Sequence, residues 1–418
     1  MKFKDYNFHP ELQKGIEKMG LKRPTDIQYK SIPHILKGED ILAVAQTGTG
    51  KTAAFAIPIL HQLQVYKQRA RREDGVRCLV LTPTHELALQ VADVFTTLGQ
   101  HTTVRVLPLI GGVDQDPQIA ALNKGIDVLV ATPGRMFDLI SQGHLRVDRV
   151  QTLVLDEADH MLDLGFIQDI SDLHRKVPAN RQTLFFSATI NLRIKKMAYA
   201  LINQKAIRIQ ISPKDPVSRN VDHYVTEVEM DDKRFFLERL VNSRPEDKIL
   251  AFVRTKVRAE RLVKAMERVG ITALAIHSGK EQQERSQVLS AFKTGTVKLL
   301  VATDVSARGI DIPEVSCVVN YDLPEQAENY VHRVGRTGRG KARGQAISFC
   351  SPQEEKLLRE AEGYIGKPIP VIKLDEDDYE NTRLLSDESG LTLNDLLQEI
   401  EGLEDERRRK KKKKKGKS

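Results

Sequence analysis

Short apolar runs recur along the chain and alternate with stretches whose apolar residues follow helical spacing. The runs are almost continuously apolar, which is typical of strands buried on both faces of a parallel sheet. Because an amphipathic stretch of helical length separates most runs, the pattern predicts βαβ units and an α/β fold. The predicted strands are residues 41–45, 78–81, 128–130, 152–155 and 183–186, followed by 249–253, 272–276, 299–301, 317–320 and 346–349.

The series of predicted strands is interrupted at residues 211–218, which read ISPKDPVS. Two prolines, two serines and mixed charge are typical of a linker. We therefore predict one α/β domain at residues 1–210, a second at residues 219–370 and a C-terminal extension at residues 371–418.

The C-terminal extension differs in composition from the rest of the chain. Residues 373–388 are acidic and polar, and we expect them to lack fixed structure. Residues 391–403 have apolar side chains at helical spacing and predict a short helix that either packs on the second domain or binds a partner protein. Residues 407–418 carry ten positive charges, so the net charge of +8 leaves −2 for the remainder. Such a tail is expected to be disordered and either contacts nucleic acid or aids solubility.

Cysteine usage and apolar run lengths narrow the class of protein further. Cys78, Cys317 and Cys350 each lie in a predicted strand, and their spacings fit neither a zinc site nor a disulfide framework. We expect buried, reduced thiols. The sequence lacks an apolar run of about 18 residues and an N-terminal signal-peptide pattern, so we expect a cytoplasmic protein with no membrane span.

Residues 45–52 read AQTGTGKT and lie between a predicted strand and a predicted helix. Backbone N–H groups at the start of a helix can surround phosphates, and Gly48 and Gly50 allow the backbone to approach closely. Lys51 would supply charge to the β- and γ-phosphates of a nucleotide, and Thr52 a hydroxyl for Mg²⁺. The strict P-loop pattern begins with glycine where this chain has alanine, so a structural glycine-rich turn is the alternative.

Residues 156–159 read DEAD and follow the predicted strand at residues 152–155. Ligands of α/β proteins bind at the carboxyl ends of strands. Asp156 fits the acid that holds Mg²⁺ in P-loop enzymes, and Glu157 is placed to orient and deprotonate an attacking water. Taken alone, the acids could instead cap the next helix.

Together, AQTGTGKT and DEAD resemble the DEAD-box RNA helicases of helicase superfamily 2, and further motifs match in order over residues 3–370. Residues 20–28, GLKRPTDIQ, are similar to the adenine-reading Q motif, with Gln28 as the reader and Phe3 as the aromatic that stacks on the base. The resemblance implies two tandem RecA-like domains that use ATP and Mg²⁺. It assigns nucleotide contacts to Gln46, Thr47, Gly48, Thr49, Gly50, Lys51 and Thr52.

The resemblance also places RNA contacts in the motifs PTHELALQ, GG, TPGR and ATDVSARGID. The residues implied are Pro83, Thr84, Gly112, Thr132, Gly134, Arg135 and Thr303. Because most are small or present their backbone, we expect contacts with phosphate and sugar and therefore binding that tolerates many sequences. By the same resemblance, closure of the domains would bend one strand and separate a short duplex locally.

The second domain would complete the ATP site. Residues 332–339 read HRVGRTGR, and the resemblance implies that Arg336 and Arg339 reach the γ-phosphate while Arg333 supports them. The alternative is a general phosphate- or RNA-binding patch. Asp311 is implied to contact the ribose. The residues implied to couple the ATP and RNA sites are Asp159, Ser187, Thr189 and His332.

Two positions depart from the family pattern. His85 stands where the family commonly has arginine, and Leu21 stands where it has an aromatic. His101, His144 and His160 show no ligand spacing and are interpreted as surface or supporting residues. The compact layout and the basic tail are similar to the bacterial RhlE-like subgroup, whose members act in ribosome assembly, RNA decay and cold adaptation.

The leading hypothesis is an RNA-dependent ATPase that separates short duplexes. An ATP-gated RNA clamp that scaffolds a complex and rarely unwinds is the main alternative, since it would use the same motifs. The Q motif together with DEAD argues against a DNA helicase, and HRVGRTGR in a second domain argues against a small-molecule kinase.

Overall fold

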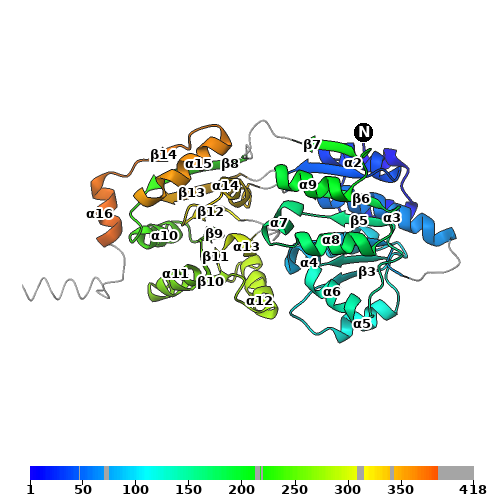
Figure 1. The fold of residues 1–418 in the computed structure, drawn as a ribbon. Helices are drawn as coiled ribbons and strands as arrows, with labels where there is room; N and C mark the ends of the chain where they lie inside the picture. The colour runs from blue at the N-terminus through cyan, green and yellow to red at the C-terminus, as the bar shows by residue number, and fades with distance from the viewer. Residues whose placement is uncertain are drawn as a thin grey trace, which may run out of the picture.

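The computed structural model describes residues 1–46, 48–69, 75–211, 217, 220–307, 315–338 and 343–384. Over these residues the chain forms two parallel sheets of seven strands each, both flanked by helices (Figure 1). The predicted α/β architecture of two RecA-like domains in tandem is thereby confirmed.

The first domain has the strand order β3-β4-β2-β5-β6-β1-β7. Its strands are β1 (Ile41–Ala45), β2 (Cys78–Leu81), β3 (Val106–Leu109), β4 (Val128–Ala131), β5 (Thr152–Leu155), β6 (Gln182–Ser187) and β7 (Ile207–Ile211). Its helices are η1 (Phe3–Tyr6), α1 (Pro10–Lys18), α2 (Asp26–Leu36), α3 (Lys51–Arg69), α4 (His85–Gly99), α5 (Asp116–Asn123), α6 (Pro133–Ser141), α7 (Ala158–Asp163), α8 (Ile167–Lys176) and α9 (Leu192–Leu201).

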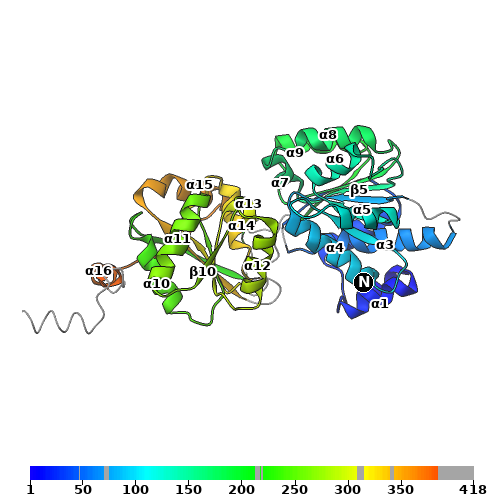
Figure 2. The same ribbon diagram turned by 90° about the horizontal axis from the view of Figure 1, so that it is seen from below.

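Successive side chains of the inner strands pack into two different cores. Ile41 and Ala43 of β1 join the core formed with α1 to α4, whereas Leu42 joins the core formed with α6 to α9. The two groups of helices lie on opposite faces of the sheet (Figure 2). Burial on both faces explains why these strands are continuously apolar in sequence.

The second domain repeats this plan with the strand order β10-β11-β9-β12-β13-β8-β14. Its strands are β8 (Val221–Glu227), β9 (Ile249–Phe252), β10 (Ala273–Ile276), β11 (Leu299–Ala302), β12 (Cys317–Asn320), β13 (Gly344–Cys350) and β14 (Val371–Ile372). Its helices are α10 (Lys233–Asn242), α11 (Lys256–Arg268), α12 (Gln282–Lys293), α13 (Asp304–Ala307), α14 (Ala327–Val334), η2 (Pro352–Glu354), α15 (Glu355–Ile365) and α16 (Glu376–Leu384).

The ten predicted strands are all present, with ends that shift by up to two residues. The four strands that the apolar pattern missed are β3, β7, β8 and β14. Three of them are edge strands, and β8 lies next to an edge. Such strands are buried less completely, so polar residues interrupt them, as in IRIQI of β7 and VDHYVTE of β8.

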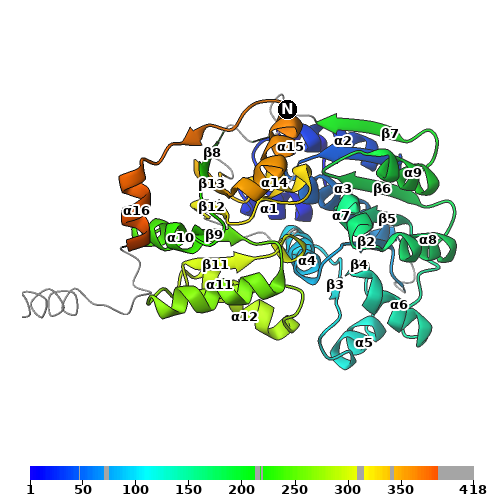
Figure 3. The same cartoon turned by 60° about the vertical axis from the view of Figure 1, so that its left-hand side comes forward.

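The second domain continues past the predicted limit at residue 370, because β14 pairs with β8 and α16 follows it. The expectation that residues 373–388 lack fixed structure is therefore wrong for residues 376–384. One aromatic side chain provides the reason: Tyr379 packs on Phe236 with ring centroids 4.9 Å apart, and its hydroxyl donates to Asp232 over 2.9 Å. Helix α16 lies beside α10 on the outer side of the domain (Figure 3).

The predicted helix at residues 391–403 and the basic tail at residues 407–418 lie outside the described residues. All three cysteines are free and buried, as predicted. Burial raises the pKa of Cys317 to about 12 and that of Cys350 to about 11, so both thiols stay protonated at neutral pH. Across the described ranges, helices with the length and apolar character needed to cross a bilayer are absent.

A buried ion pair joins α10 to η2, the short helix after β13. Lys233 is 0% exposed, contacts the carboxylate of Glu354 and donates to the carbonyl of Tyr321 over 2.8 Å. The Glu354 carboxylate also accepts from the backbone N–H of Leu323 over 3.1 Å and from Ser351. This pair ties three separate segments of the second domain together.

Replacing Lys233 with methionine should lower the free energy of unfolding of the second domain by about 3 kcal/mol or more, because it leaves the Glu354 carboxylate buried without its principal cation. Urea-induced unfolding measures the change. Lys356→Met is the matched control, since that side chain is 88% exposed and should change stability by less than about 0.5 kcal/mol. Equal midpoints for the two variants would contradict a stabilising role for the pair.

Candidate active site and RNA interface

The strand order places the motifs found in the sequence in two groups along one edge of the first sheet. The carboxyl ends of parallel strands share an edge, and ligands of α/β proteins bind there. Strands β5, β6 and β1 are neighbours, and they lead into DEAD, SAT and the P-loop. Strands β3, β4 and β2 form the other half, and they lead into GG, TPGR and PTHEL.

The P-loop connects β1 to α3 as predicted. Gly48 and Gly50 have φ values of 78° and 88°, which a residue with a side chain rarely adopts. The Thr49 hydroxyl donates to the carbonyl of Gln46 over 2.8 Å and closes the turn. Lys51 is buried, and its Nζ donates to the Ala45 carbonyl over 2.8 Å. Its ammonium group therefore lies inside the loop.

The Q motif holds the P-loop from the side. The Gln28 amide donates to the carbonyl of Gly50 over 3.0 Å, while its oxygen accepts from the backbone N–H of Thr25 over 2.9 Å. The Thr25 hydroxyl donates to the carbonyl of Thr49 over 2.8 Å. A Cβ atom at Gly50 would lie 2.5 Å from the Gln28 amide nitrogen, so a side chain there would displace the Gln28 amide from this hydrogen bond.

The predicted stacking of Phe3 on the base has no support in this packing. Phe3 is 1% exposed and belongs to the core of the first domain, so its ring would have to leave that core to meet a base. Leu21, the departure from the family aromatic, packs against the same core. Both Phe3 and Leu21 therefore pack in or against the apolar core of the first domain.

The DEAD carboxylates lie at the end of β5, where Asp156 and Asp159 are buried and Glu157 is partly buried. Burial is the main cause that raises the pKa of Asp156 to about 7, with Lys51 opposing it and Glu157 adding to it. Burial would also raise the pKa of Glu157, but His160, Lys51 and Arg336 together outweigh it and lower that pKa to about 2. The pKa values of these two adjacent acids are therefore shifted in opposite directions, and Glu157 stays ionised at neutral pH.

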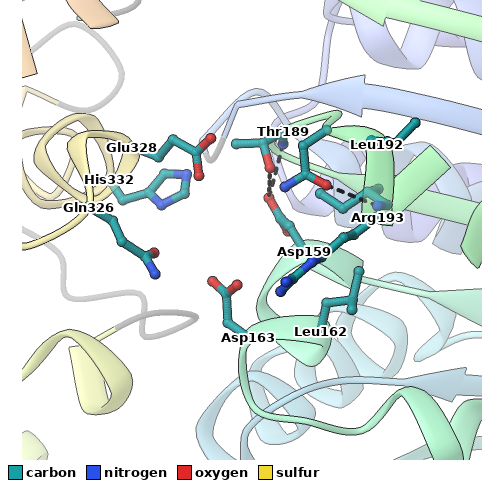
Figure 4. Close-up of a pocket in the computed structure, with 11 residues that line it drawn as sticks. Asp159, Leu162, Asp163, Thr189, Leu192, Arg193, Gln326, Glu328 and His332 are labelled. Carbon is teal, nitrogen blue, oxygen red and sulfur yellow. Dashed lines mark hydrogen bonds between the residues drawn. The ribbon is translucent and has the colours of Figure 1, made fainter. Parts of the chain in front are cut away.

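Asp159 links DEAD to the SAT motif. Its carboxylate accepts from the backbone N–H groups of Ala188 and Thr189 over 3.1 and 2.9 Å, and from the Thr189 hydroxyl over 3.0 Å. Ser187 donates to the carbonyl of Thr189 over 2.8 Å. A pocket of about 620 Å³ lies between Asp159 and Thr189 on one side and His332 on the other (Figure 4).

The arginines of HRVGRTGR have different surroundings. Arg333 is 1% exposed and forms a bidentate pair with Asp304, at 2.6 and 2.7 Å. It also donates to the Asp322 carbonyl over 2.6 Å, so it fixes α14 to two strand ends, as its supporting role requires. Arg336 is 4% exposed and lies close enough to Glu157 of the first domain to lower the pKa of that acid.

The two domains meet at the half of the edge formed by the loops after β3, β4 and β2, which carries the motifs predicted to contact RNA and is called the RNA half below. The His85 ring lies 2.9 Å from the amide oxygen of Gln282, and Glu86 pairs with Arg285 at 2.7 Å. A Cβ atom at Gly112 would lie 3.3 Å from Cβ of Gln282. Histidine at position 85, where the family commonly has arginine, therefore still contacts the second domain through Gln282. The interdomain ion pair is formed by the neighbouring residue, Glu86.

The predicted RNA residues lie on this same half. Pro83 and Thr84 follow β2, Gly112 follows β3, and Thr132, Gly134 and Arg135 follow β4, while Thr303 follows β11. Thr84 caps α4, its hydroxyl accepting from the Leu87 N–H over 3.3 Å. Arg135 donates to the carbonyl of Val113 over 2.8 Å and so holds the loop after β3. Thr47, Asp311 and Arg339 lie outside the described residues.

Two family descriptions match the chain in tandem, namely DEAD/DEAH box helicase over residues 25–197 and helicase conserved C-terminal domain over residues 232–341. A DEAD-box ATP-dependent RNA helicase named CshA from Geobacillus kaustophilus (strain HTA426) is 43% identical over 360 residues, which are 86% of this chain and 76% of the relative. This chain belongs to the DEAD-box ATP-dependent RNA helicases. The CshA of Bacillus subtilis (strain 168) is 39% identical over 86% of this chain and 72% of its own.

Solved structures of this family show the same fold. S. cerevisiae Dbp5 bound to RNA and ADP BeF3 is 30% identical, with a TM-score of 0.80 over 92% of this chain and 98% of the other. A DEAD box protein from Methanococcus jannaschii is 36% identical, yet its TM-score is 0.51 over 89% and 99% of the chains. The helicase therefore resembles the Dbp5 complex more in overall arrangement, although it resembles the Methanococcus jannaschii protein more in sequence.

Sequence reasoning missed how some residues of the helicase's cleft pair with one another. The motif PTHELALQ contains Glu86, and Gln282 and Arg285 match the QxxR element of the family, but the interdomain ion pair between Glu86 and Arg285 joins residues 199 positions apart, and no sequence spacing reveals it. His160 is buried beside Glu157, where an i, i+3 spacing from the acid was the available signal. The narrower RhlE-like assignment stays a prediction, because the matching relatives carry the name CshA.

Gln28→Ala should raise the KM of the helicase for ATP about tenfold, because the P-loop loses its hydrogen bond to the Q motif and, if Gln28 reads the base as predicted, the base loses a contact. Steady-state hydrolysis at several ATP concentrations measures the change. Gln100→Ala, at an exposed position, is the matched control. If both variants kept the parent KM, the Q motif would have no part in nucleotide binding.

Proposed function

We propose that this helicase hydrolyses Mg²⁺-bound ATP in the cleft between its domains and uses closure of that cleft to separate short RNA duplexes locally. The observation that carries the proposal is the pocket of about 620 Å³ between the domains, which Asp159 and Thr189 of the first domain border together with His332 of the second. Each domain supplies one half of the catalytic set, so hydrolysis requires both. Closure would then act as a conformational gate.

The residues at the end of β5 fit a divalent cation. Asp156 is 3% exposed, and its high pKa reflects burial beside another carboxylate. A cation there would offset the buried negative charge, and carboxylate and hydroxyl oxygens are the ligands Mg²⁺ takes. Asp156 and Thr52 are proposed to hold it. When bound, Mg²⁺ neutralises charge on the phosphate oxygens.

Glu157 is proposed to act as the general base. A pKa of about 2 keeps its carboxylate ionised, so it can orient the attacking water and accept its proton. Lys51 and Arg336 would stabilise the charge that develops on the transferred phosphoryl group, with Arg336 as the arginine finger. Arg339 is proposed to assist, and Gln46, Thr47 and Asp311 to contact the nucleotide. Their roles rest on the family motif.

RNA is proposed to cross the half of the edge formed by the loops after β2, β3 and β4. Gly112 and Gly134 are exposed there, and glycine backbone can approach a phosphate closely. Thr84 and Thr132 are the N-caps of α4 and α6, so the N-termini of both helices, which favour anions, lie at this half of the edge. Such contacts carry little sequence information, which supports sequence-tolerant binding.

Coupling is proposed to pass through Asp159, whose carboxylate already joins DEAD to SAT. His332 borders the same pocket from the second domain, so closure would bring it toward these groups. Helix α16 belongs to the C-terminal extension and lies on the outer side of the second domain. We propose that the C-terminal extension adds affinity for RNA or for a protein partner. Three buried, free thiols are compatible with a cytoplasmic location.

Steady-state ATP hydrolysis should rise at least tenfold with single-stranded RNA and little with single-stranded DNA. Glu157→Gln should abolish the stimulated rate, because removing a general base typically costs roughly 10²–10⁴-fold. Hydrolysis of equal rate with and without RNA would contradict the gating proposal. A strand-separation assay on a short duplex then distinguishes the helicase from an ATP-gated clamp, which would hold RNA without releasing a strand.

Arg135→Ala should weaken single-stranded RNA binding about tenfold and leave ATP binding unchanged, because the loop with Gly112 loses its tie to α6. Fluorescence anisotropy with labelled RNA and a fluorescent nucleotide measures both affinities. Arg146→Ala, an exposed arginine paired only locally with Asp148, controls for net charge. Equal loss of RNA and nucleotide binding would refute the assignment to the RNA interface.

A further inference from the structure

His160 is a buried polar residue without a structural explanation. Its side chain is 4% exposed in α7, and within the described residues neither ring nitrogen has a hydrogen-bond partner. Burying a polar group without a partner is costly, so such groups in native proteins call for an explanation. A side chain needed only for packing would be apolar at this position.

The polar group that His160 does face is the carboxylate of Glu157. Its Nδ1 lies 3.6 Å from Oε2 of the acid, just beyond hydrogen-bond distance. Glu157 is the N-cap of α7, and His160 lies three residues later in the first turn of the helix. Glu157 has a left-handed backbone with φ 51° and ψ 50°, unusual for a residue with a side chain, so its direction is fixed by the fold.

We infer that His160 is a positioning residue for catalysis, whose Nδ1–H donates to the Glu157 carboxylate and holds it toward the attacking water. The inference deepens the proposed function, since it rests on Glu157 acting as the general base. A carboxylate oxygen that accepts from His160 leaves the other oxygen for the water. Fixing the carboxylate in this way reduces the freedom lost on reaching the transition state.

The contact between His160 and Glu157 also identifies Nδ1 as the ring nitrogen that would hold the carboxylate. Nδ1 is attached directly to the first ring carbon, so the amide nitrogen of asparagine occupies nearly the same place. The amide of glutamine lies one carbon farther out, and leucine has similar bulk but no donor. These three replacements separate hydrogen bonding by Nδ1 from filling of the buried space.

His160→Leu should lower the RNA-stimulated kcat about tenfold with little change in KM for ATP, a fraction of what a general base contributes. His160→Asn should recover most of that kcat, and His160→Gln should not. Exposed His144→Leu is the matched control and should match the parent. Binding of a fluorescent ADP and the thermal midpoint, measured for every variant, verify folding independently of catalysis.

A kcat of His160→Leu within twofold of the parent, or equal losses in His160→Asn and His160→Leu, would overturn the inference. Combining His160→Leu with Glu157→Gln provides the second arm. If His160 acts through Glu157, the double variant should be no slower than Glu157→Gln alone. Should Glu157→Gln itself stay active, the proposed base is wrong; should only the His160 variants stay active, the base stands and this inference fails.

Discussion

The burial of two parallel sheets on both faces is the constraint on which the rest of the molecule depends. Inner strands such as β1 and β5 are wholly covered by helices, so their side chains serve packing alone. Chemistry is left to the loops at the carboxyl ends, and strand order decides which loops meet. In the first domain that order places β5, β6 and β1 together, so the P-loop, DEAD and SAT form one cluster.

The negative charge of this cluster favours the approach of a cationic group from the second domain. Asp156 is buried and the adjacent Glu157 is partly buried, and one cation of the first domain, Lys51, opposes them. Buried charge of one sign is costly unless it is paired, so the approach of Arg336 lowers that cost. The same electrostatics that suit phosphate chemistry thus favour closure. The similarity to Dbp5 bound to RNA and ADP BeF3 agrees with this arrangement.

The sequence was most informative where a single physical requirement, such as burial of a strand on both faces, determines the residues. Continuous apolar runs predicted every fully buried inner strand, and motif spacing brought the P-loop and DEAD to one site, as the fold confirms. Tertiary packing decided the rest. Phe3 fits a motif position yet lies in the core, and Tyr379 orders α16 within a stretch whose acidic composition predicted disorder. The burial of His160 likewise depends on helices around it, which its i, i+3 spacing cannot reveal.

The contacts between domains are distributed unevenly along the cleft. On the RNA half, Glu86 pairs with Arg285 and His85 meets Gln282, whereas a pocket of about 620 Å³ separates Asp159 from His332. If RNA and ATP both bind between the domains as proposed, the contacts on one half of the edge and the pocket on the other belong to the same closed arrangement. Each ligand would then favour that arrangement, and by reciprocal linkage each would tighten binding of the other.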